Sequence, residues 1–232
     1  MKKYSYIGIS FIVLIFGIIF FPRIMDRIEN QSISDTKRLS KSDELSFIKL
    51  NGEKRKVANF LFLNQDSLYV SNEDYNGKVF VAEFFFTRCP SICIEMNKNM
   101  KILDELYGDR DDFGIASFTI DPENDTPTTL KKYSELIEVK SKNWHFLTGD
   151  KEDIYELSNK GFNIFSSINE AVEGGFEHQG FFALIDQNGY IRSRVNEYGT
   201  PIVYYSGITN ENENVQGIEL IKKDIDKLLK TQ

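Results

Sequence analysis

A strand-like run and a pair of cysteines meet in the stretch Val79-Phe80-Val81-Ala82-Glu83-Phe84-Phe85-Phe86-Thr87-Arg88-Cys89-Pro90-Ser91-Ile92-Cys93. Residues 79–86 are continuously β-branched and aromatic, which is typical of a strand that is buried on both faces. Cys89 and Cys93 are the only cysteines in the chain. A chain with one such pair is not a disulfide-stapled scaffold, so the pair indicates a redox couple, a metal site, or both.

The residues after the cysteines predict a strand-and-helix alternation. Apolar residues recur at helical spacing from Ile92 to Leu106, and Gly108 offers a stop. Residues 113–120 have strand composition, and a helix over 126–137 follows, with Thr126 as its cap and Pro127 in its first turn. The cysteines therefore lie at the carboxyl end of a strand, where open α/β sheets usually place their sites.

The rest of the chain completes an α/β fold with a mixed sheet flanked by helices. We expect a hairpin in front of the cysteine strand and a second hairpin, around Asp186-Gln187-Asn188-Gly189, near the end. The expected elements are the hairpin 60–70, a strand at 144–147, a helix at 151–160, a loop or lobe at 161–175, the hairpin 180–195 and an amphipathic helix at 215–229.

The amino terminus predicts a membrane anchor. Residues 4–21 are almost all apolar, and lysines and arginines flank them. A cleaved signal peptide is the competing interpretation, but no small-x-small cleavage pattern follows the run. We expect an anchor at 1–22, a polar tether at 23–46 and one folded domain at 47–232. The domain is expected on the extracytoplasmic side, because a long hydrophilic segment can follow the first helix across the membrane.

The length and charge limit the function classes. The chain has 232 residues and a formal net charge of -7. An acidic body does not suit the phosphates of nucleic acid, which require a basic face. The length suits one well-buried domain in addition to the anchor.

The predicted position of the cysteine loop, at the start of a helix, favours activated thiols. A thiol at the start of a helix meets free backbone N–H groups and the positive end of the helix dipole, and Arg88 adds positive charge. A buried, inert disulfide is the alternative. Redox dithiols of the thioredoxin kind have two residues between the cysteines, whereas this pair has three, which slightly favours a shared metal.

A metal would need a third ligand, and the chain has only two histidines. His145 lies in a predicted strand and is expected to be structural. His178 lies in a glycine-flanked loop before a strand, where a ligand role and a solvated role are equally compatible with the sequence. Met96 and Met100 are possible soft donors, but their helical spacing favours core packing. Two thiolates and an imidazole suit copper(I), copper(II) or zinc.

Four segments in this order resemble the Sco (SenC) copper chaperones of cytochrome oxidase assembly. They are the cysteine loop 84–93, residues 119–127, residues 144–149, and His178 followed by 184–189. The resemblance covers most of residues 58–230. It implies a thioredoxin-like fold, a membrane anchor, and one copper ion held by Cys89, Cys93 and His178. It also places Asp121 near the copper loop, where a site role and a local turn role both remain open.

The chain departs from the family pattern in two places: Ile94 stands where many members have proline, and Phe176-Glu177 precede His178 where valine and aspartate are often found. Neither departure removes a ligand atom.

The resemblance implies a membrane-tethered metallochaperone that delivers copper to the CuA site of an oxidase subunit. The alternative is a thiol-disulfide oxidoreductase that keeps the acceptor's cysteines reduced, with Cys89 and Cys93 as the redox pair. A thiol peroxidase and a purely structural domain are weaker hypotheses.

Overall fold

The structure is a computed structural model that describes residues 13–16, 20, 45–195, 200–209 and 217–230. Its centre is a mixed sheet in the order β1-β12-β11-β6-β7-β8, and β13 also pairs with β11. Strands β6, β7 and β8 run parallel, and β11, β12 and β1 continue the sheet with antiparallel pairs. The strands are β1 (Ser46–Phe47), β6 (Val79–Phe85), β7 (Phe113–Thr119), β8 (Trp144–Leu147), β11 (Phe181–Ile185), β12 (Ile191–Ser193) and β13 (Tyr205–Ser206).

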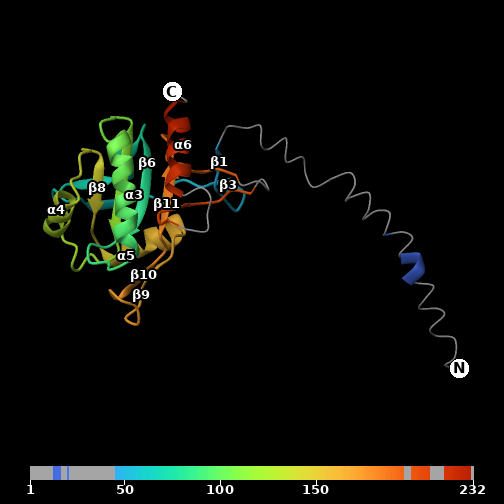
Figure 1. Cartoon of the computed structure of the whole chain (residues 1–232), viewed down its shortest axis with the longest axis horizontal. Coiled ribbons are helices and arrows are strands. Elements are labelled where there is room, and N and C mark those ends of the chain that lie inside the picture. Colours follow the sequence, from blue (N-terminus) through green and yellow to red (C-terminus); the bar gives the residue numbers. More distant parts are fainter. Residues whose placement is uncertain (1–12, 17–19, 21–44, 196–199, 210–216, 231–232) are drawn as a thin grey trace. The chain divides into compact units, whose positions relative to one another are not determined.

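Three helices cover one face of the sheet (Figure 1). They are α3 (Ile92–Tyr107), α4 (Pro127–Leu136) and α6 (Gly217–Lys230). Tyr133 of α4 packs on Phe85 of β6, with 5.7 Å between the ring centroids. Tyr107 of α3 packs on Phe113 of β7 and donates a hydrogen bond to the carbonyl of Lys222 in α6, so α3 and α6 lie side by side.

The other face of the sheet is covered by smaller elements. Phe118 of β7 contacts Phe60 beside a hairpin, and Phe84 of β6 contacts Phe162 at the end of a π-helical turn. All four rings are buried in the core. The elements on this face are the hairpin strands β4 (Leu61–Leu63) and β5 (Tyr69–Ser71), the short helix η1 (Asn72–Tyr75), α5 (Lys151–Glu156) and its π-helical continuation η2 (Leu157–Phe162).

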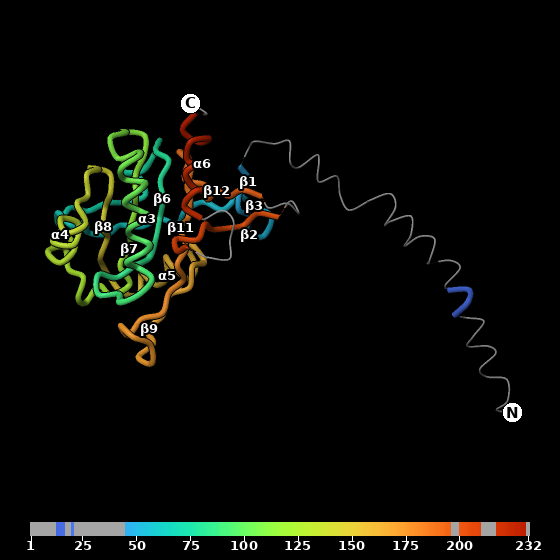
Figure 2. Tube along the Cα trace, viewed as in Figure 1, coloured from blue at the N-terminus to red at the C-terminus, as the bar shows by residue number. Residues whose placement is uncertain are grey.

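Two small hairpins stand apart from the central sheet. Strands β2 (Lys49–Leu50) and β3 (Glu53–Lys54) form one of them. The other joins β9 (Ser166–Ile168) to β10 (Phe176–His178), and Figure 2 shows it extending away from the sheet. Its turn contains Gly174 and Gly175, both in the left-handed region at φ +91° and +81°. Such angles favour glycine because a Cβ atom crowds the backbone there.

The strand–helix–strand–helix order around the cysteines is confirmed, and so are both predicted hairpins. Two expectations need correction. The helix predicted over 151–160 is α-helical only to Glu156 and then widens into the π-helical turn, which closes on Asn163 at φ +58°. The loop or lobe expected at 161–175 contains strand β9, which lacks the apolar alternation that marks a strand because its hairpin is largely exposed.

The predicted membrane anchor at 1–22 lies almost entirely outside the described residues. Within the described part of the chain, no helix is both long enough and apolar enough to cross a bilayer.

Candidate metal centre

The thiol loop connects the end of β6 to the start of α3. After Phe85 the chain turns, with the amide of Cys89 donating to the carbonyl of Phe86 at 3.2 Å. Helix α3 begins at Ile92, and its cap residue Ser91 makes no side-chain capping bond. The Cys89 sulfur lies 3.4 Å from the amide of Cys93 and accepts its hydrogen bond. The sulfur therefore satisfies one of the free N–H groups of the helix start.

The two thiols differ in their access to solvent. Cys89 is 8% exposed and Cys93 is 1% exposed, and neither forms a disulfide. Cys93 lies in the first turn of α3, beneath the loop that carries Cys89. A partner molecule therefore meets Cys89 first.

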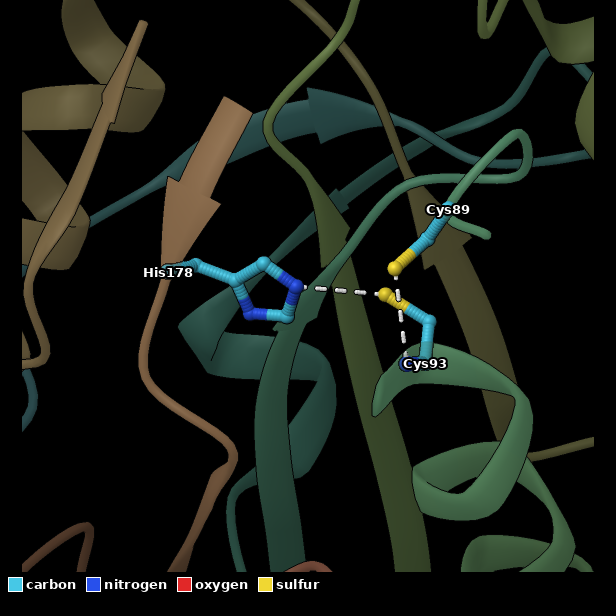
Figure 3. Close-up of side chains that lie close together, drawn as sticks. All are labelled: Cys89, Cys93 and His178. Atoms are coloured by element: carbon cyan, nitrogen blue, oxygen red, sulfur yellow. Dashed lines mark hydrogen bonds between the residues drawn. The ribbon is translucent and has the colours of Figure 1, made fainter. Parts of the chain in front are cut away.

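His178 lies 85 residues after Cys93 in the sequence, but its side chain lies beside the thiols. It is the last residue of β10, and its pairing with Ser166 of β9 fixes its register. The ring of Phe86 packs against the imidazole, with 5.9 Å between the ring centroids, and also against Phe176. His178 Nε2 lies 3.2 Å from the Sγ atom of Cys93. A dashed line marks this contact in Figure 3.

The three side chains meet the distance requirement of a metal site. The Sγ atoms of Cys89 and Cys93 and a ring nitrogen of His178 all lie within 4.8 Å of one another. Two donors that each lie about 2.3 Å from one ion are at most about 4.6 Å apart, so small side-chain movements bring all three into range. The other ring nitrogen, Nδ1, is buried and has no hydrogen-bond partner among the described residues. The imidazole is thus held by ring packing and by the sulfur contact.

The two thiols have very different pKa values. The hydrogen bond from the Cys93 side chain lowers the pKa of Cys89 to about 4, with help from His178 and two backbone amides and against the effect of burial. Burial raises the pKa of the Cys93 thiol, and the negative charge of Cys89 raises it further. At neutral pH the metal-free pair holds a thiolate at Cys89 and a thiol at Cys93. This is the arrangement of an accessible nucleophile backed by a protonated partner.

Two carboxylates hold the loop from the side of β7. Asp125 is fully buried and accepts hydrogen bonds from the amide and hydroxyl of Thr87 and from the hydroxyl of Thr119. Asp121 accepts from Arg88 at 2.8 Å and from Asn124. The two residues immediately before Cys89 are therefore tied to the turn that follows β7. Asp121 acts on the loop through Arg88, because its carboxylate is engaged by Arg88 and Asn124.

The other candidate donors lie in structural positions. Met96 and Met100 are fully buried in the core, as their helical spacing predicts. His145 packs edge-on against Tyr75 and lies 3.5 Å from the amide nitrogen of Asn64. Its pKa is lowered, chiefly by burial. His145 is not among the group of possible ligands in the described chain, which consists of Cys89, Cys93 and His178.

Sequence reasoning missed the role of Asp125 and Thr87. Both residues lie in the segments that carry the family resemblance, but their contact joins positions 38 residues apart. The one available signal was the pair of acidic residues, Asp121 and Asp125, at the end of a predicted strand. Sequence reasoning also gave no role to Phe86, whose aromatic ring packs against His178.

The fold is a mixed α/β sheet, and two thiols with different pKa values lie at a strand-to-helix loop beside an imidazole. These features define a thiol protein that is suited to binding a soft metal or exchanging disulfides. The SCO1/SenC family model matches residues 48–212. The chain therefore belongs to the SCO1/SenC family.

Individual relatives agree with this assignment. The SCO1 protein homolog of Bacillus subtilis is 37% identical over 143 residues, which cover 60% of this chain and 73% of the relative. A SCO1/SenC family lipoprotein of Bacillus anthracis has a TM-score of 0.64 at 33% identity and covers 75% of this chain and 95% of its own. BsSco, described as having a disulfide switch and as a member of the Sco family of cytochrome c oxidase assembly proteins, has a TM-score of 0.62 at 32% identity, with coverage of 77% and 95%.

More distant structures share the fold alone. Copper-bound ScoI of Bradyrhizobium japonicum is 20% identical with a TM-score of 0.53, and copper-bound yeast Sco1 is 19% identical with a TM-score of 0.52. They cover 75% and 76% of this chain, and 99% and 87% of their own.

Proposed function

We propose that this chain is a copper metallochaperone in which Cys89, Cys93 and His178 hold one copper ion and deliver it to the CuA site of a cytochrome c oxidase subunit. The observation that supports the proposal most directly is the convergence of two sulfurs and one ring nitrogen within 4.8 Å. Two thiolates and an imidazole form a soft donor set, which favours copper(I) among common metals. Membership of the Sco family and the copper-bound fold neighbours support the same ion.

The unequal thiols suit transfer by ligand exchange. Cys89 is the more exposed sulfur and sits on the loop, so an incoming thiolate of the acceptor replaces it first. Cys93 and His178 hold the ion from below until the acceptor completes its own ligand set. The route requires that the ion stays reachable, which fits the shallow cavity of about 210 Å³ beside Cys89 and His178.

The test is copper binding by the purified full-length chain. We expect one copper(I) per chain, with sulfur and nitrogen neighbours in the copper K-edge absorption spectrum. His178→Ala is expected to lower the affinity by at least about tenfold, since even the loss of a residue that supports a ligand costs 10–100-fold. His145→Ala is the matched control, because that imidazole lies away from the sulfurs. Undiminished binding by His178→Ala contradicts the proposed ligand set.

A second function is favoured by one observation, the low pKa of Cys89 beside a protonated Cys93. A thiolate backed by a resolving thiol is the arrangement of a thiol-disulfide oxidoreductase, which would keep the acceptor's cysteines reduced. His178 discriminates between the two functions. Disulfide exchange with a model disulfide is expected to survive His178→Ala, whereas copper retention is not.

The domain boundaries and location belong to the proposal as well. We place the anchor at 1–22, the tether at 23–46 and a thioredoxin-like domain at 47–232, on the extracytoplasmic side of the membrane. Membrane fractionation tests the anchor. Protease treatment of intact cells, with the outer layer made permeable to the protease, tests the side of the membrane on which the domain lies. Digestion of the domain only after lysis contradicts the assigned side.

A further inference from the structure

The shallow cavity of about 210 Å³ beside Cys89 and His178, which we call the recess, is walled largely by the β9–β10 hairpin. The hairpin turn and β10 contribute Val172, Glu173, Phe176 and Glu177 to its lining. The turn also lies against the thiol loop, since a Cβ atom on Gly174 would be 3.1 Å from Pro90. A molecule that reaches Cys89 through the recess therefore contacts the hairpin as well.

The wall of the recess is partly apolar. Val172 is 37% exposed, and Ile92 and Phe176 are half-buried. Further along the same hairpin, Ile168 at the end of β9 is 52% exposed. Burying such surface against a partner is favourable, because it removes apolar area from water. The recess thus offers contact area as well as access to a sulfur.

Apart from His178, the charged side chains of the hairpin are all acidic. Residues 166–178 include Glu170, Glu173 and Glu177 but no lysine or arginine. All three glutamates are exposed. Within the described part of the chain none of them has an ion-pair partner, and Glu177 accepts one hydrogen bond from Asn169 at 3.1 Å. The hairpin therefore presents uncompensated negative charge beside the recess.

The thiol loop does not compensate this charge. Arg88 is its cationic side chain, but Arg88 does not line the recess. The guanidinium of Arg88 instead donates to Asp121, in the turn that follows β7, at 2.8 Å. Among the described residues that line the recess, none is a lysine or an arginine. A cation that could pair with the hairpin must come from another molecule.

We propose that the recess and the acidic hairpin are the docking site for the acceptor protein, and that the acceptor carries a lysine or arginine beside its cysteine. The cationic side chain pairs with Glu173 while the cysteine faces Cys89. Complementary charge chiefly speeds encounter and fixes the orientation of docking. Anionic lipids and nucleic acids have the same sign of charge as the hairpin and are repelled. The inference rests on the proposed function for the acceptor's identity and adds the chemistry that recognises it.

The test is the rate of disulfide exchange between the reduced, metal-free, full-length chain and two short peptides. The peptides differ only in the residues that flank a central cysteine, which are lysines in one and glutamates in the other. Each is supplied as a mixed disulfide with pyridine-2-thiol. The Cys89 thiolate attacks the peptide sulfur, and the pyridine-2-thiolate leaves, takes a proton from water and is measured as the absorbing thione. We expect the lysine peptide to react about tenfold faster, the lower end of electrostatic steering.

Glu173→Lys isolates the contribution of the hairpin. The Cys89 thiolate and the net charge of -7 also attract a cationic peptide, so the wild-type preference alone does not assign it. Glu173→Lys is expected to remove most of the preference. Glu173→Gln is expected to have about half of that effect on a logarithmic scale, because Coulomb energy is proportional to charge.

Glu105→Lys is the matched control, since it makes the same change of charge at an exposed position near the other end of α3. Glu105 lies about 18 Å along the helix from Cys93, beyond the Debye length of about 10 Å at 0.1 M ionic strength. We expect the control to keep the preference of the wild type. The copper(I) affinity of Glu173→Lys is also expected to match that of the wild type, because the variant keeps all three proposed ligands.

Salt gives an independent readout. At about 1 M ionic strength the Debye length falls to about 3 Å, so the wild-type preference is expected to disappear almost completely. A preference that persists at this ionic strength contradicts recognition by charge. A merely structural effect of Glu173 on the hairpin would change both peptide rates alike at either ionic strength.

The outcomes separate the two proposals. A wild-type chain that binds no copper(I) but prefers the lysine peptide contradicts the proposed function and leaves the docking of a basic partner intact. A chain that binds one copper(I) but reacts equally with both peptides overturns the inference alone. Equal losses of preference in Glu173→Lys and Glu105→Lys also overturn it. Should near-ultraviolet circular dichroism show that Glu173→Lys does not fold, Glu173→Gln decides, and an unchanged ratio of the two rates contradicts the docking role.

Discussion

At the scale of single residues, the two cysteines have different chemistry although both lie in the same loop. Cys89 accepts hydrogen bonds from the first turn of α3 and from Cys93, while Cys93 lies in the apolar interior. Hydrogen bonds to a thiolate favour it and burial disfavours it, and burial is the largest cause of the raised pKa of Cys93. One sulfur is therefore anionic and reachable, and the other is protonated and shielded.

This difference predicts the order and pH dependence of alkylation. In the reduced, metal-free chain, iodoacetamide is expected to modify Cys89 before Cys93. Because the pKa of Cys89 is lowered to about 4, its thiolate is already present at pH 5, and its alkylation rate is expected to change little between pH 5 and 8. An ordinary thiol with a pKa of about 8.5 speeds up nearly tenfold per pH unit over that range. Mass spectrometry of quenched samples measures both rates.

Cys93→Ala is the matched variant for this experiment. It removes the side-chain hydrogen bond that is the largest cause of the low pKa of Cys89. The alkylation rate of Cys89 is then expected to rise with pH. First modification at Cys93 in the wild type, or a wild-type rate at Cys89 that climbs tenfold per pH unit, contradicts the assignment.

At the scale of elements, the β9–β10 hairpin sets the position of His178. The hairpin extends from the sheet (Figure 1). The ring of Phe176 in β10 packs against Phe86 of the thiol loop, and the glycine turn lies close to the same loop. A Cβ atom on Gly174 would lie 3.1 Å from both Phe86 and Pro90, whereas one on Gly175 would meet nothing within 4 Å. Both glycines have positive φ, so they differ in contacts and not in backbone strain.

This pair of glycines predicts how the hairpin controls metal binding. Gly175→Ala is expected to cost about 1 kcal/mol of stability, from backbone strain alone, and to leave the copper affinity nearly intact. Gly174→Ala adds crowding against the thiol loop and is expected to displace the hairpin and lower the affinity well below that of Gly175→Ala. Competition with a copper(I) chelator measures both affinities. Equal losses in the two variants show that the hairpin turn does not position the imidazole.

At the scale of the whole described domain, a buried carboxylate is one of the links between α6 and the sheet. Asp224 accepts two hydrogen bonds from Arg194, at 2.7 and 2.8 Å, and one from the hydroxyl of Tyr205 at 2.8 Å. Burial pushes the pKa of Asp224 up, but Arg194 and Tyr205 together outweigh burial and leave it lowered. A carboxylate whose folded-state pKa is depressed stabilises the fold above its unfolded pKa, and this contribution is lost as the pH falls through the folded value.

The network predicts a pH-dependent loss of stability. Asp224→Ala is expected to cost about 3–5 kcal/mol at pH 7, because it leaves Arg194 without its partner in a part-buried position. The cost is expected to shrink as the pH falls below about 4, the pKa of the carboxyl in the unfolded chain, and to keep shrinking until the pH has passed the lowered pKa of the folded state. Urea unfolding at several pH values gives the free energies. Asp109→Ala, at an exposed position, serves as the control, and a cost for Asp224→Ala that is the same at pH 3 and pH 7 contradicts the mechanism.

The sequence by itself determined the elements around the thiols. A continuous apolar strand, helical spacing and the Thr126-Pro127 start are local patterns, and local patterns follow from backbone sterics and burial that neighbouring residues decide. The cysteine pair and its activated chemistry were predicted for the same reason. From the residues alone, His178 could have been either a ligand or a solvated side chain. The resemblance to the Sco family then favoured the ligand role.

Only the tertiary structure decided which distant groups meet. His178 lies 85 residues from Cys93, and Thr87 lies 38 residues from Asp125. The periodicity of the sequence does not predict such contacts, because they depend on strand register and on where the β9–β10 hairpin places His178. The pKa values of the thiols follow from these contacts and from burial, since both set the free energy of a charge inside the protein.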